Sequence, residues 1–220
     1  MPRTWRALRI LLIVWLVLLG MLSCPPAAVA QNSGSARDEW QHPDRVLNTM
    51  GIRAGSVVAD VGCGRGYFTF KFAERVGASG KVYAVDIDED DLDSIRREAA
   101  RQHLAQIQTV LGAPDNPRLP EGTLDAVLVM NAYHEFREPL AMLAGIYRAL
   151  KPGGILALID GAAPIGHPRE YYQGMHRLPE IFEQEDALRA GFHFLRQEPG
   201  FSRTYGGKQF YFLLFEKPRR

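Results

Sequence analysis

The chain has 220 residues, of which 46% are hydrophobic and 23% are charged, and its formal net charge at pH 7 is +1. This is an ordinary globular composition with room for one domain of useful core size. A charge so close to neutral argues against a nucleic-acid backbone as the main partner, because phosphate neutralisation needs clustered lysine and arginine side chains.

The first 30 residues differ from the rest of the chain. Three arginines lie before residue 10, residues 10–22 are large and apolar except for one glycine, and residues 28–30 are Ala-Val-Ala. A positive start, an apolar run too short for a comfortable membrane span and small residues at the cleavage positions are typical of a secretory signal peptide. We therefore predict cleavage after Ala30, which leaves residues 31–220 as one exported domain, periplasmic or secreted. Cleavage removes three arginines and no acids, so the formal net charge falls from +1 to −2.

Two alternatives remain open for this segment. The apolar run is longer if the residues before it are included, so residues 8–22 would then be an uncleaved membrane anchor. Residues 22–24, Leu-Ser-Cys, also resemble a lipoprotein cleavage site, although the residues before the cysteine fit that pattern poorly. After cleavage at Ala30 only Cys63 is left, so the mature chain forms no intrachain disulfide.

A glycine-rich loop follows the first predicted strand. Residues 57–61 are mostly apolar and indicate a short buried strand, glycines follow at positions 62, 64 and 66, and the apolar-rich residues 67–76 indicate a helix. Glycine allows positive φ angles and a close approach to the main chain. The free N–H groups of the helix N-terminus favour an anionic or strongly polar ligand. A glycine-rich turn that binds nothing is the alternative.

The next predicted strand, residues 81–86, ends in Asp86, twenty residues after the last glycine. This is the offset at which nucleotide-binding folds hold the two ribose hydroxyls. The third glycine comes one residue earlier than in the dinucleotide pattern, and Asp60 precedes the loop. An acid at that position repels a pyrophosphate but suits an ammonium group, which disfavours an NAD-dependent oxidoreductase.

The later elements follow in an alternating order. The acidic residues 88–91 precede a helix with arginines towards its end, which matches the helix dipole and indicates a helix start, not a metal site. Residues 124–130 are so continuously apolar that we expect a central strand of a parallel sheet. The remaining predicted elements are a strand at 107–111, a helix at 139–150 stopped by residues 151–154, a strand at 155–159, a helix at 180–190, and strands at 192–197 and 209–215.

Four of these segments together resemble the class I S-adenosylmethionine-dependent methyltransferases. They are residues 60–66 (DVGCGRG), 85–87 (VDI), 124–131 (LDAVLVMN) and 150–154 (LKPGG), and the resemblance covers residues 37–218. It implies an α/β, Rossmann-like fold with a seven-stranded sheet, mostly parallel with an antiparallel last strand, and helices on both faces. It also implies S-adenosyl-L-methionine as the cofactor. The resemblance says little about the methyl acceptor.

The resemblance assigns cofactor-binding roles to the loop and to the strand ends, with Asn131 beside the methionine part of the cofactor. The residues so assigned are Asp60, Gly62, Gly64, Gly66, Asp86, Ile87 and Asn131. Many relatives carry an acid directly after the glycine that ends the third strand, where it binds the adenine amino group. This chain has Ala113 there, with Asp115 two residues further on.

Candidate residues for the acceptor lie after two strand ends, where open α/β sheets bind their ligands. His134 follows the strand at 124–130 and is the predicted catalytic residue, because its pKa suits removal of a proton from a hydroxyl or amine. Residues 162–179 have no periodic pattern, and we predict that they bind the acceptor through His176 and Arg177. A capping or purely structural role is the alternative for His134, and an ordinary surface loop for residues 162–179. No set of cysteines and histidines has zinc-ligand spacing, so no metal is expected.

The predicted function is methyl transfer from S-adenosylmethionine to a small-molecule acceptor. The alternative is a non-catalytic S-adenosyl-binding interaction module of the cell envelope, suggested by the export signal because this cofactor is made in the cytoplasm. The expected partner is a small molecule, not a nucleic acid. A membrane is expected only through an uncleaved N-terminal segment.

Overall fold

The structure, a computed structural model, describes residues 33–172, 174–201, 204–205 and 208–219. The predicted signal peptide lies outside the described residues. The chain divides into two units, residues 1–36 and 37–220, and the description of the first is limited to residues 33–36 at the start of a helix. Among the described residues, no helix combines the length and the apolar character that crossing a bilayer requires.

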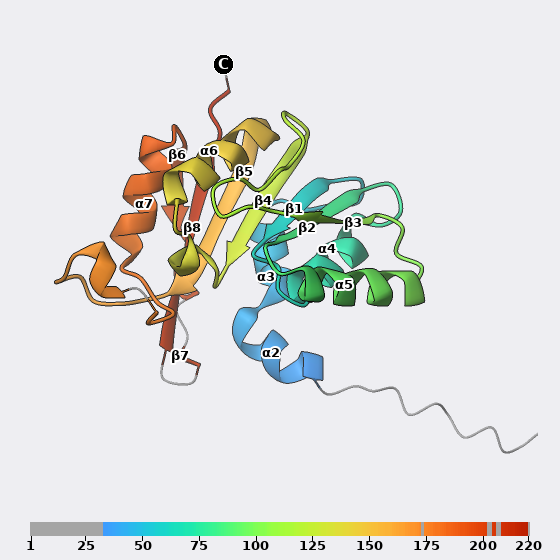
Figure 1. Ribbon diagram of the computed structural model, residues 1–220, viewed down its shortest axis with the longest axis horizontal. Helices are drawn as coiled ribbons and strands as arrows, with labels where there is room; N and C mark the ends of the chain where they lie inside the picture. Colours follow the sequence, from blue (N-terminus) through green and yellow to red (C-terminus); the bar gives the residue numbers. More distant parts are fainter. Residues whose placement is uncertain (1–32, 173, 202–203, 206–207, 220) are drawn as a thin grey trace, which may run out of the picture. The chain divides into compact units, whose positions relative to one another are not determined.

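The centre of the second unit is a sheet with the strand order β3-β2-β1-β4-β5-β8-β6, and a short β7 pairs with β8. The strands from β3 to β5 are parallel, β8 is antiparallel to β5, and β6 is antiparallel to β8. This arrangement confirms the predicted seven-stranded, mostly parallel sheet with an antiparallel last strand (Figure 1). The strands are β1 (Val57–Val61), β2 (Lys81–Asp86), β3 (Ile107–Leu111), β4 (Leu124–Met130), β5 (Leu150–Gly161), β6 (His193–Gln197), β7 (Thr204–Tyr205) and β8 (Lys208–Glu216).

Helices cover both faces of the sheet, as expected (Figure 1). The central strand β4 shows why: Leu128 and Met130 pack in the cluster that includes α3 and α4, whereas Val127 and Val129 pack in the cluster that includes α6 and α7. A strand buried on both faces cannot alternate between apolar and polar residues, and this explains its continuous apolar run. The helices are α2 (Ser33–Gln41), α3 (Pro43–Thr49), α4 (Tyr67–Val76), α5 (Glu89–Arg101), α6 (Pro139–Ala149) and α7 (Glu180–Arg189), with short 3₁₀ helices η1 (Tyr133–Glu135) and η2 (Arg169–Tyr172).

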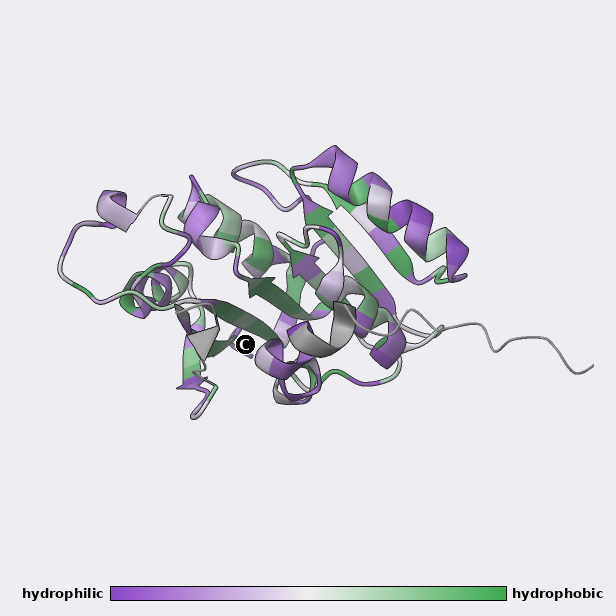
Figure 2. Ribbon diagram, turned by 90° about the horizontal axis from the view of Figure 1, so that it is seen from below, coloured by the Kyte–Doolittle hydropathy of each residue, from purple (hydrophilic) through white to green (hydrophobic). Residues whose placement is uncertain are grey.

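The hydropathy of the ribbon agrees with these layers. Figure 2 shows strands that are largely hydrophobic and helices with alternating hydrophilic and hydrophobic turns. Helix α5 is the clearest case, because its first turn is acidic and its buried residues are Leu92, Ile95 and Ala99. Asp88 caps this helix by accepting hydrogen bonds from the backbone N–H groups of Asp90 and Asp91. The acidic run therefore begins a helix, as the sequence predicts.

Strand β5 differs most from the sequence prediction, which placed it at residues 155–159. Strand β5 begins at Leu150, although residues 151–154 were expected to be a stop between helix and strand. The difference arises from long-range pairing, since Gly153 N–H donates to Lys217 O at 2.7 Å and Lys217 N–H donates to Gly154 O at 2.9 Å.

The register of the parallel strands places the site. Val61 lies beside both Val85 and Val129, and Met130 lies beside Ile159, so β1, β2, β4 and β5 end at the same edge of the sheet. The segments that follow these strands therefore meet at one place, which is where open α/β sheets bind their ligands.

Candidate active site

The loop between β1 and α4 has the backbone conformation that its glycines permit. Gly62, Gly64 and Gly66 have φ angles of 73°, 48° and 84°, which side chains other than glycine rarely adopt. A Cβ atom on Gly62 would lie only 2.3 Å from the Cβ of Ala132. Glycine at position 62 thus lets the segment after β4 pack directly on the loop.

Hydrogen bonds tie this loop to the end of β2. Gly62 N–H donates to Val85 O at 2.9 Å, and Gly64 N–H donates to Asp86 Oδ2 at 2.8 Å. The other carboxylate oxygen, Asp86 Oδ1, accepts from the N–H groups of Ile87 and Asp88 at 2.8 and 3.1 Å. These bonds fix the orientation of the Asp86 carboxylate beside the glycine loop.

A pocket of about 600 Å³ opens at this point, lined by the glycine loop and by the segments after β2, β3 and β4. Several features fit an adenosyl group. A Cβ on Gly64 would meet only the Asp91 carboxylate, at 3.8 Å, so the loop leaves room for a ligand close to the main chain. Ile87 is 65% exposed in spite of its apolar side chain, and a bound base would cover it. The sequence-predicted residues that line the pocket are Gly62, Gly64, Asp86, Ile87 and Asn131.

Two other predicted cofactor residues lie behind the loop. Asp60 is buried, and its Oδ2 accepts a hydrogen bond from Thr69 Oγ1 at 2.7 Å. Burial raises the pKa of Asp60 to about 6, and the nearby Asp86 carboxylate adds to this effect, while the Thr69 hydrogen bond and the Arg37 guanidinium oppose it. Gly66 precedes the first residue of α4, and a Cβ there would lie 2.9 Å from Ile95 Cγ1. The absence of a side chain at position 66 therefore lets α5 pack close to the loop. Neither residue is among those that line the pocket.

The segment after β3 lines the pocket with Ala113 and Pro114, whereas Asp115 does not line it and is exposed. The absence of an acid at position 113, noted from the sequence, is therefore not compensated by Asp115. In this chain the wall beyond β3 is apolar.

His134 lies at the ends of β4 and β5, on the 3₁₀ helix η1. Its Nδ1 atom is 2.8 and 2.9 Å from the two carboxylate oxygens of Asp160, and its backbone N–H donates to Asp160 Oδ2 at 3.1 Å. Both side chains are buried, with 2% exposed for His134 and 0% for Asp160. Because a carboxylate only accepts, Nδ1 carries the proton of this contact, and in the neutral imidazole Nε2 then has the lone pair.

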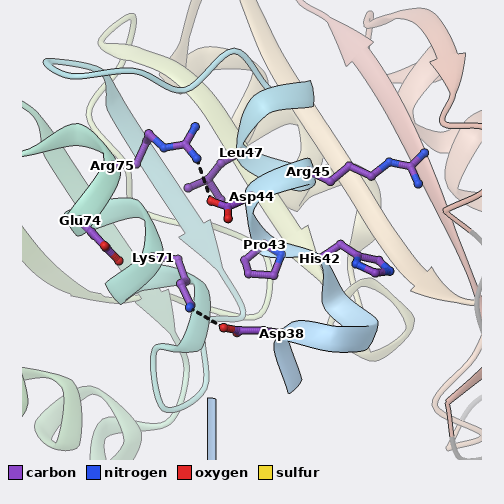
Figure 3. Close-up of a pocket in the computed structure, with 9 residues that line it drawn as sticks. All are labelled: Asp38, His42, Pro43, Asp44, Arg45, Leu47, Lys71, Glu74 and Arg75. Carbon is purple, nitrogen blue, oxygen red and sulfur yellow. Dashed lines mark hydrogen bonds and ion pairs between the residues drawn. The ribbon is translucent and has the colours of Figure 1, made fainter. Parts of the chain in front are cut away.

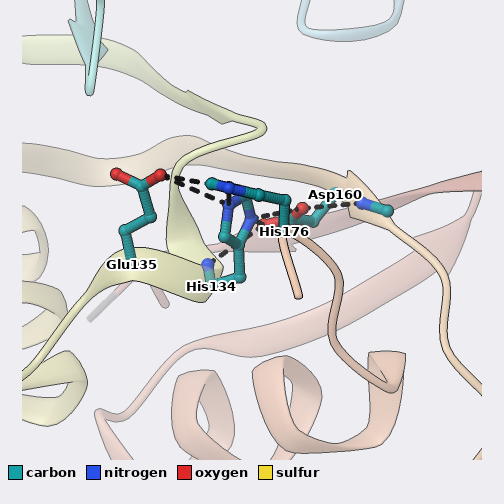
Figure 4. A network of polar contacts seen from close by, with 5 residues as sticks. His134, Glu135, Asp160 and His176 are labelled. Atoms are coloured by element: carbon teal, nitrogen blue, oxygen red, sulfur yellow. Dashed lines mark hydrogen bonds and ion pairs between the residues drawn. The ribbon is translucent and has the colours of Figure 1, made fainter. Parts of the chain in front are cut away.

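His176 and Glu135 complete a group of polar side chains around this histidine (Figure 4). His134 Nε2 lies 3.3 Å from His176 Nδ1 and 3.6 Å from Glu135 Oε1, and His176 Nδ1 lies 3.4 Å from Glu135 Oε1. Glu135 also lines the cofactor pocket, so the group borders on it. Arg177, also predicted to bind the acceptor, is exposed beside His176.

The sequence did not reveal Asp160 as the partner of His134, nor the role of Glu135 as a neighbour of both histidines. It also gave no sign of the buried carboxyl of Glu183 behind Asp160. Burial raises the pKa of Glu183 well above its usual range, and the nearby Asp160 carboxylate adds to this effect.

A second hollow, of about 710 Å³, lies beside α3 and α4 (Figure 3). Four of its charged side chains are paired: Lys71 Nζ lies 2.9 Å from Asp38 Oδ2, and Arg75 donates to Asp44 Oδ1 at 3.0 Å. Paired surface charges are not drawn to an ionic ligand. The carboxyl ends of the strands and the glycine loop lie at the other pocket, which we therefore take as the active site.

Comparison with known proteins agrees with this geometry. Residues 58–154 match the family described as a methyltransferase domain. The sheet order confirms the predicted fold. The match, which covers less than half of the chain, agrees with the predicted S-adenosylmethionine-dependent methyltransferase and supports S-adenosylmethionine as the cofactor.

Particular relatives are methyltransferases of several kinds. The chain is 34% identical over 139 residues to a nocamycin O-methyltransferase from Saccharothrix syringae, covering 63% of this chain and 49% of that protein. It is 29% identical over 136 residues to a demethylmenaquinone methyltransferase from Geobacillus sp. (strain WCH70), covering 61% and 57%. A crystal structure of a SAM-dependent methyltransferase from Aquifex aeolicus is 27% identical with a TM-score of 0.68, covering 82% of this chain and 92% of that one. The chain spans about half the length of the curated relatives it matches.

We predict that Asp86→Ala weakens binding of S-adenosylhomocysteine by about 10- to 100-fold, because hydrogen bonds to a charged group are each worth about 1.5–3 kcal/mol. Isothermal titration calorimetry measures this change. The matched control is Asp115→Ala, an exposed acid outside the pocket, which is expected to bind like the wild type. Equal affinities for the two variants would contradict the assigned role of Asp86.

Asp60 gives a prediction about stability. Its folded-state pKa of about 6 exceeds the usual 3.8, so folding favours the protonated form, and Asp60 makes the protein less stable as the pH rises from about 4 to about 6. Asp60→Asn removes this penalty and is expected to raise the free energy of unfolding at pH 7.5 by up to about 3 kcal/mol. Urea denaturation at pH 7.5 and pH 4 measures it, and the gain should vanish at the lower pH. A loss of stability at pH 7.5, or a gain no larger than that of Asp115→Asn, would refute the prediction.

Proposed function

We propose that this chain transfers the methyl group of S-adenosylmethionine to a small molecule that carries an acidic hydroxyl group. When bound, this cofactor supplies an activated methyl group on a sulfonium, so the protein mainly positions the donor and the acceptor. On this proposal, the glycine loop and Asp86 hold the adenosyl part, and Asn131 lies at the end nearest the acceptor.

The observation that carries the proposal is the pair His134 and Asp160 beside the cofactor pocket. Asp160 fixes the histidine tautomer and leaves Nε2 with the lone pair. We assign His134 as the residue that activates the acceptor, in its simplest form by taking the hydroxyl proton on Nε2. His176 and Arg177 would contact the acceptor from the segment after β5.

The names of the relatives support this substrate class without fixing the acceptor. One is a nocamycin O-methyltransferase and another is a demethylmenaquinone methyltransferase. We therefore expect a phenol or a hydroxyquinone rather than a nucleic acid, in keeping with the near-neutral charge of the chain.

We expect the wild-type chain to release S-adenosylhomocysteine in the presence of an acceptor from a panel of phenols and hydroxyquinones. His134→Ala should lower the turnover by about 100- to 10,000-fold, the usual contribution of general acid–base catalysis, while S-adenosylhomocysteine still binds. His193→Ala changes an exposed histidine on β6 and serves as the control. Binding of S-adenosylhomocysteine without turnover on any acceptor would instead favour the non-catalytic module.

We also propose that the enzyme acts outside the cytoplasm. The support is the sequence of residues 1–30, with its positive start, its apolar run and its small residues before position 31. The N-terminal sequence of the protein isolated from its host is expected to begin at Gln31. A chain that begins at Met1 in the soluble cytoplasmic fraction would contradict this location and would leave the methyltransferase proposal unaffected.

A further inference from the structure

We propose that His134, Glu135 and His176 bind a divalent transition-metal ion of the zinc class, which holds and activates the hydroxyl group of the methyl acceptor. This inference rests on the proposed function and specifies how the acceptor is bound. Nothing in the sequence indicates this site, because the two histidines are 42 residues apart and belong to no zinc-binding pattern.

The separations of the three donor atoms fit a single ion. His134 Nε2, His176 Nδ1 and Glu135 Oε1 are 3.3, 3.4 and 3.6 Å from one another. Tetrahedral zinc with bonds of about 2.0–2.1 Å separates its ligand atoms by about 3.3–3.4 Å. The three atoms therefore already lie close to the positions of one face of such a tetrahedron, and these three residues converge on a common point (Figure 4).

The surroundings of His134 are those of a metal ligand. Metal-binding histidines usually donate their second N–H group to a carboxylate, which fixes the ring and raises its basicity. Asp160 accepts from Nδ1 at 2.8 Å and is itself buried. Nε2 therefore directs its lone pair towards the other two donor atoms. A cation bound between the three atoms would replace the hydrogen bond between His134 Nε2 and His176 Nδ1.

The backbone holds His176 in place from the other side. The segment after β5 returns to its own strand end, where Leu178 N–H donates to Gly161 O at 2.9 Å. His176 has a left-handed φ of 50°, and its carbonyl oxygen would lie 3.0 Å from a Cβ on Gly161. A non-glycine residue in the left-handed region is uncommon and is a frequent feature of binding sites. Because position 161 is a glycine, the backbone at His176 can pass close to the end of β5.

The ligand set leaves room for an acceptor. Two histidines and one glutamate are a set found in catalytic zinc sites, which keep their fourth position open. His134 is buried, but the side chains of Glu135 and His176 are 65% and 60% exposed, so the open position faces solvent. Glu135 also lines the cofactor pocket, which puts the ion at the border between donor and acceptor.

The ion accounts for activation of the acceptor without a protein base. A hydroxyl bound at the fourth position has a lowered pKa and loses its proton to solvent water. Its oxygen then forms the new bond to the methyl carbon as the S–CH₃ bond breaks, and the electron pair of that bond stays on sulfur. With the ion bound, His134 Nε2 is a metal ligand and takes no proton. His134 then activates the acceptor through the metal and not as a base.

Cobalt(II) tests the site, because four-coordinate Co²⁺ absorbs visible light and substitutes for zinc. We expect the untagged full chain to bind one Co²⁺ with the absorption of a four- or five-coordinate ion. His176→Ala and Glu135→Gln should lose this signal. Asp160→Asn, which changes a positioning residue, should weaken Co²⁺ binding by about 10- to 100-fold. The matched control is His167→Ala, an exposed histidine of the same segment that stacks on Tyr171, and it should bind Co²⁺ like the wild type.

Calorimetry with S-adenosylhomocysteine on the same proteins separates the two proposals. His176 does not line the cofactor pocket, so His176→Ala should bind this product with wild-type affinity, which also shows that the variant is folded. No Co²⁺ binding by a wild type that binds S-adenosylhomocysteine would overturn the metal site and leave His134 as a direct base. Co²⁺ binding that survives in both His176→Ala and Glu135→Gln would overturn it equally, since the ion then lies elsewhere. Failure of the wild type to bind S-adenosylhomocysteine would overturn the proposed function itself.

Discussion

The active site depends on the hydrogen bonds that join the glycine loop to the end of β2. Val85 and Asp86 accept backbone N–H groups from the loop, and Asp86 also accepts from the two residues that follow it. These bonds fix the loop, the start of α4 and the orientation of the Asp86 carboxylate at the same time. Ala132 packs directly against Gly62, so the glycine loop also positions the segment after β4 that lines the pocket.

Different pairs of parallel strands supply the two halves of the site. β1 and β2 supply the half that suits an adenosyl group, and β4 and β5 supply the half with His134 and Asp160. Both halves exist at one edge because parallel neighbours end together. A sulfonium cofactor already carries the activated group, so a few well-placed side chains suffice for the acceptor half. Because few side chains are needed to position an acceptor, the same fold can serve methyltransferases that act on different acceptors.

The sequence indicated most of the predicted residues that line the pocket near the glycine loop, but not the neighbours of His134, for a physical reason. The glycine loop and Asp86 lie within 22 residues of each other, so local pattern and spacing reveal them. Asp160 and His176 reach His134 from 26 and 42 residues away, through strand pairing and a loop without periodicity. Strand β5 was predicted too short for the same reason, since its first residues pair with the distant end of the chain. The burial of Asp60 behind the loop could not be predicted either, because a position in a motif does not tell whether a side chain faces the pocket or the core.

Hydrogen–deuterium exchange with and without S-adenosylhomocysteine tests the central claim most directly, because it reports where on the chain the ligand binds. Bound product is expected to slow amide exchange in residues 62–66, 86–88 and 112–114, and to leave the hollow beside α3 and α4 unchanged. Protection confined to that hollow, or no protection anywhere at saturating ligand, would contradict the assignment of the glycine loop and Asp86 as the adenosyl site.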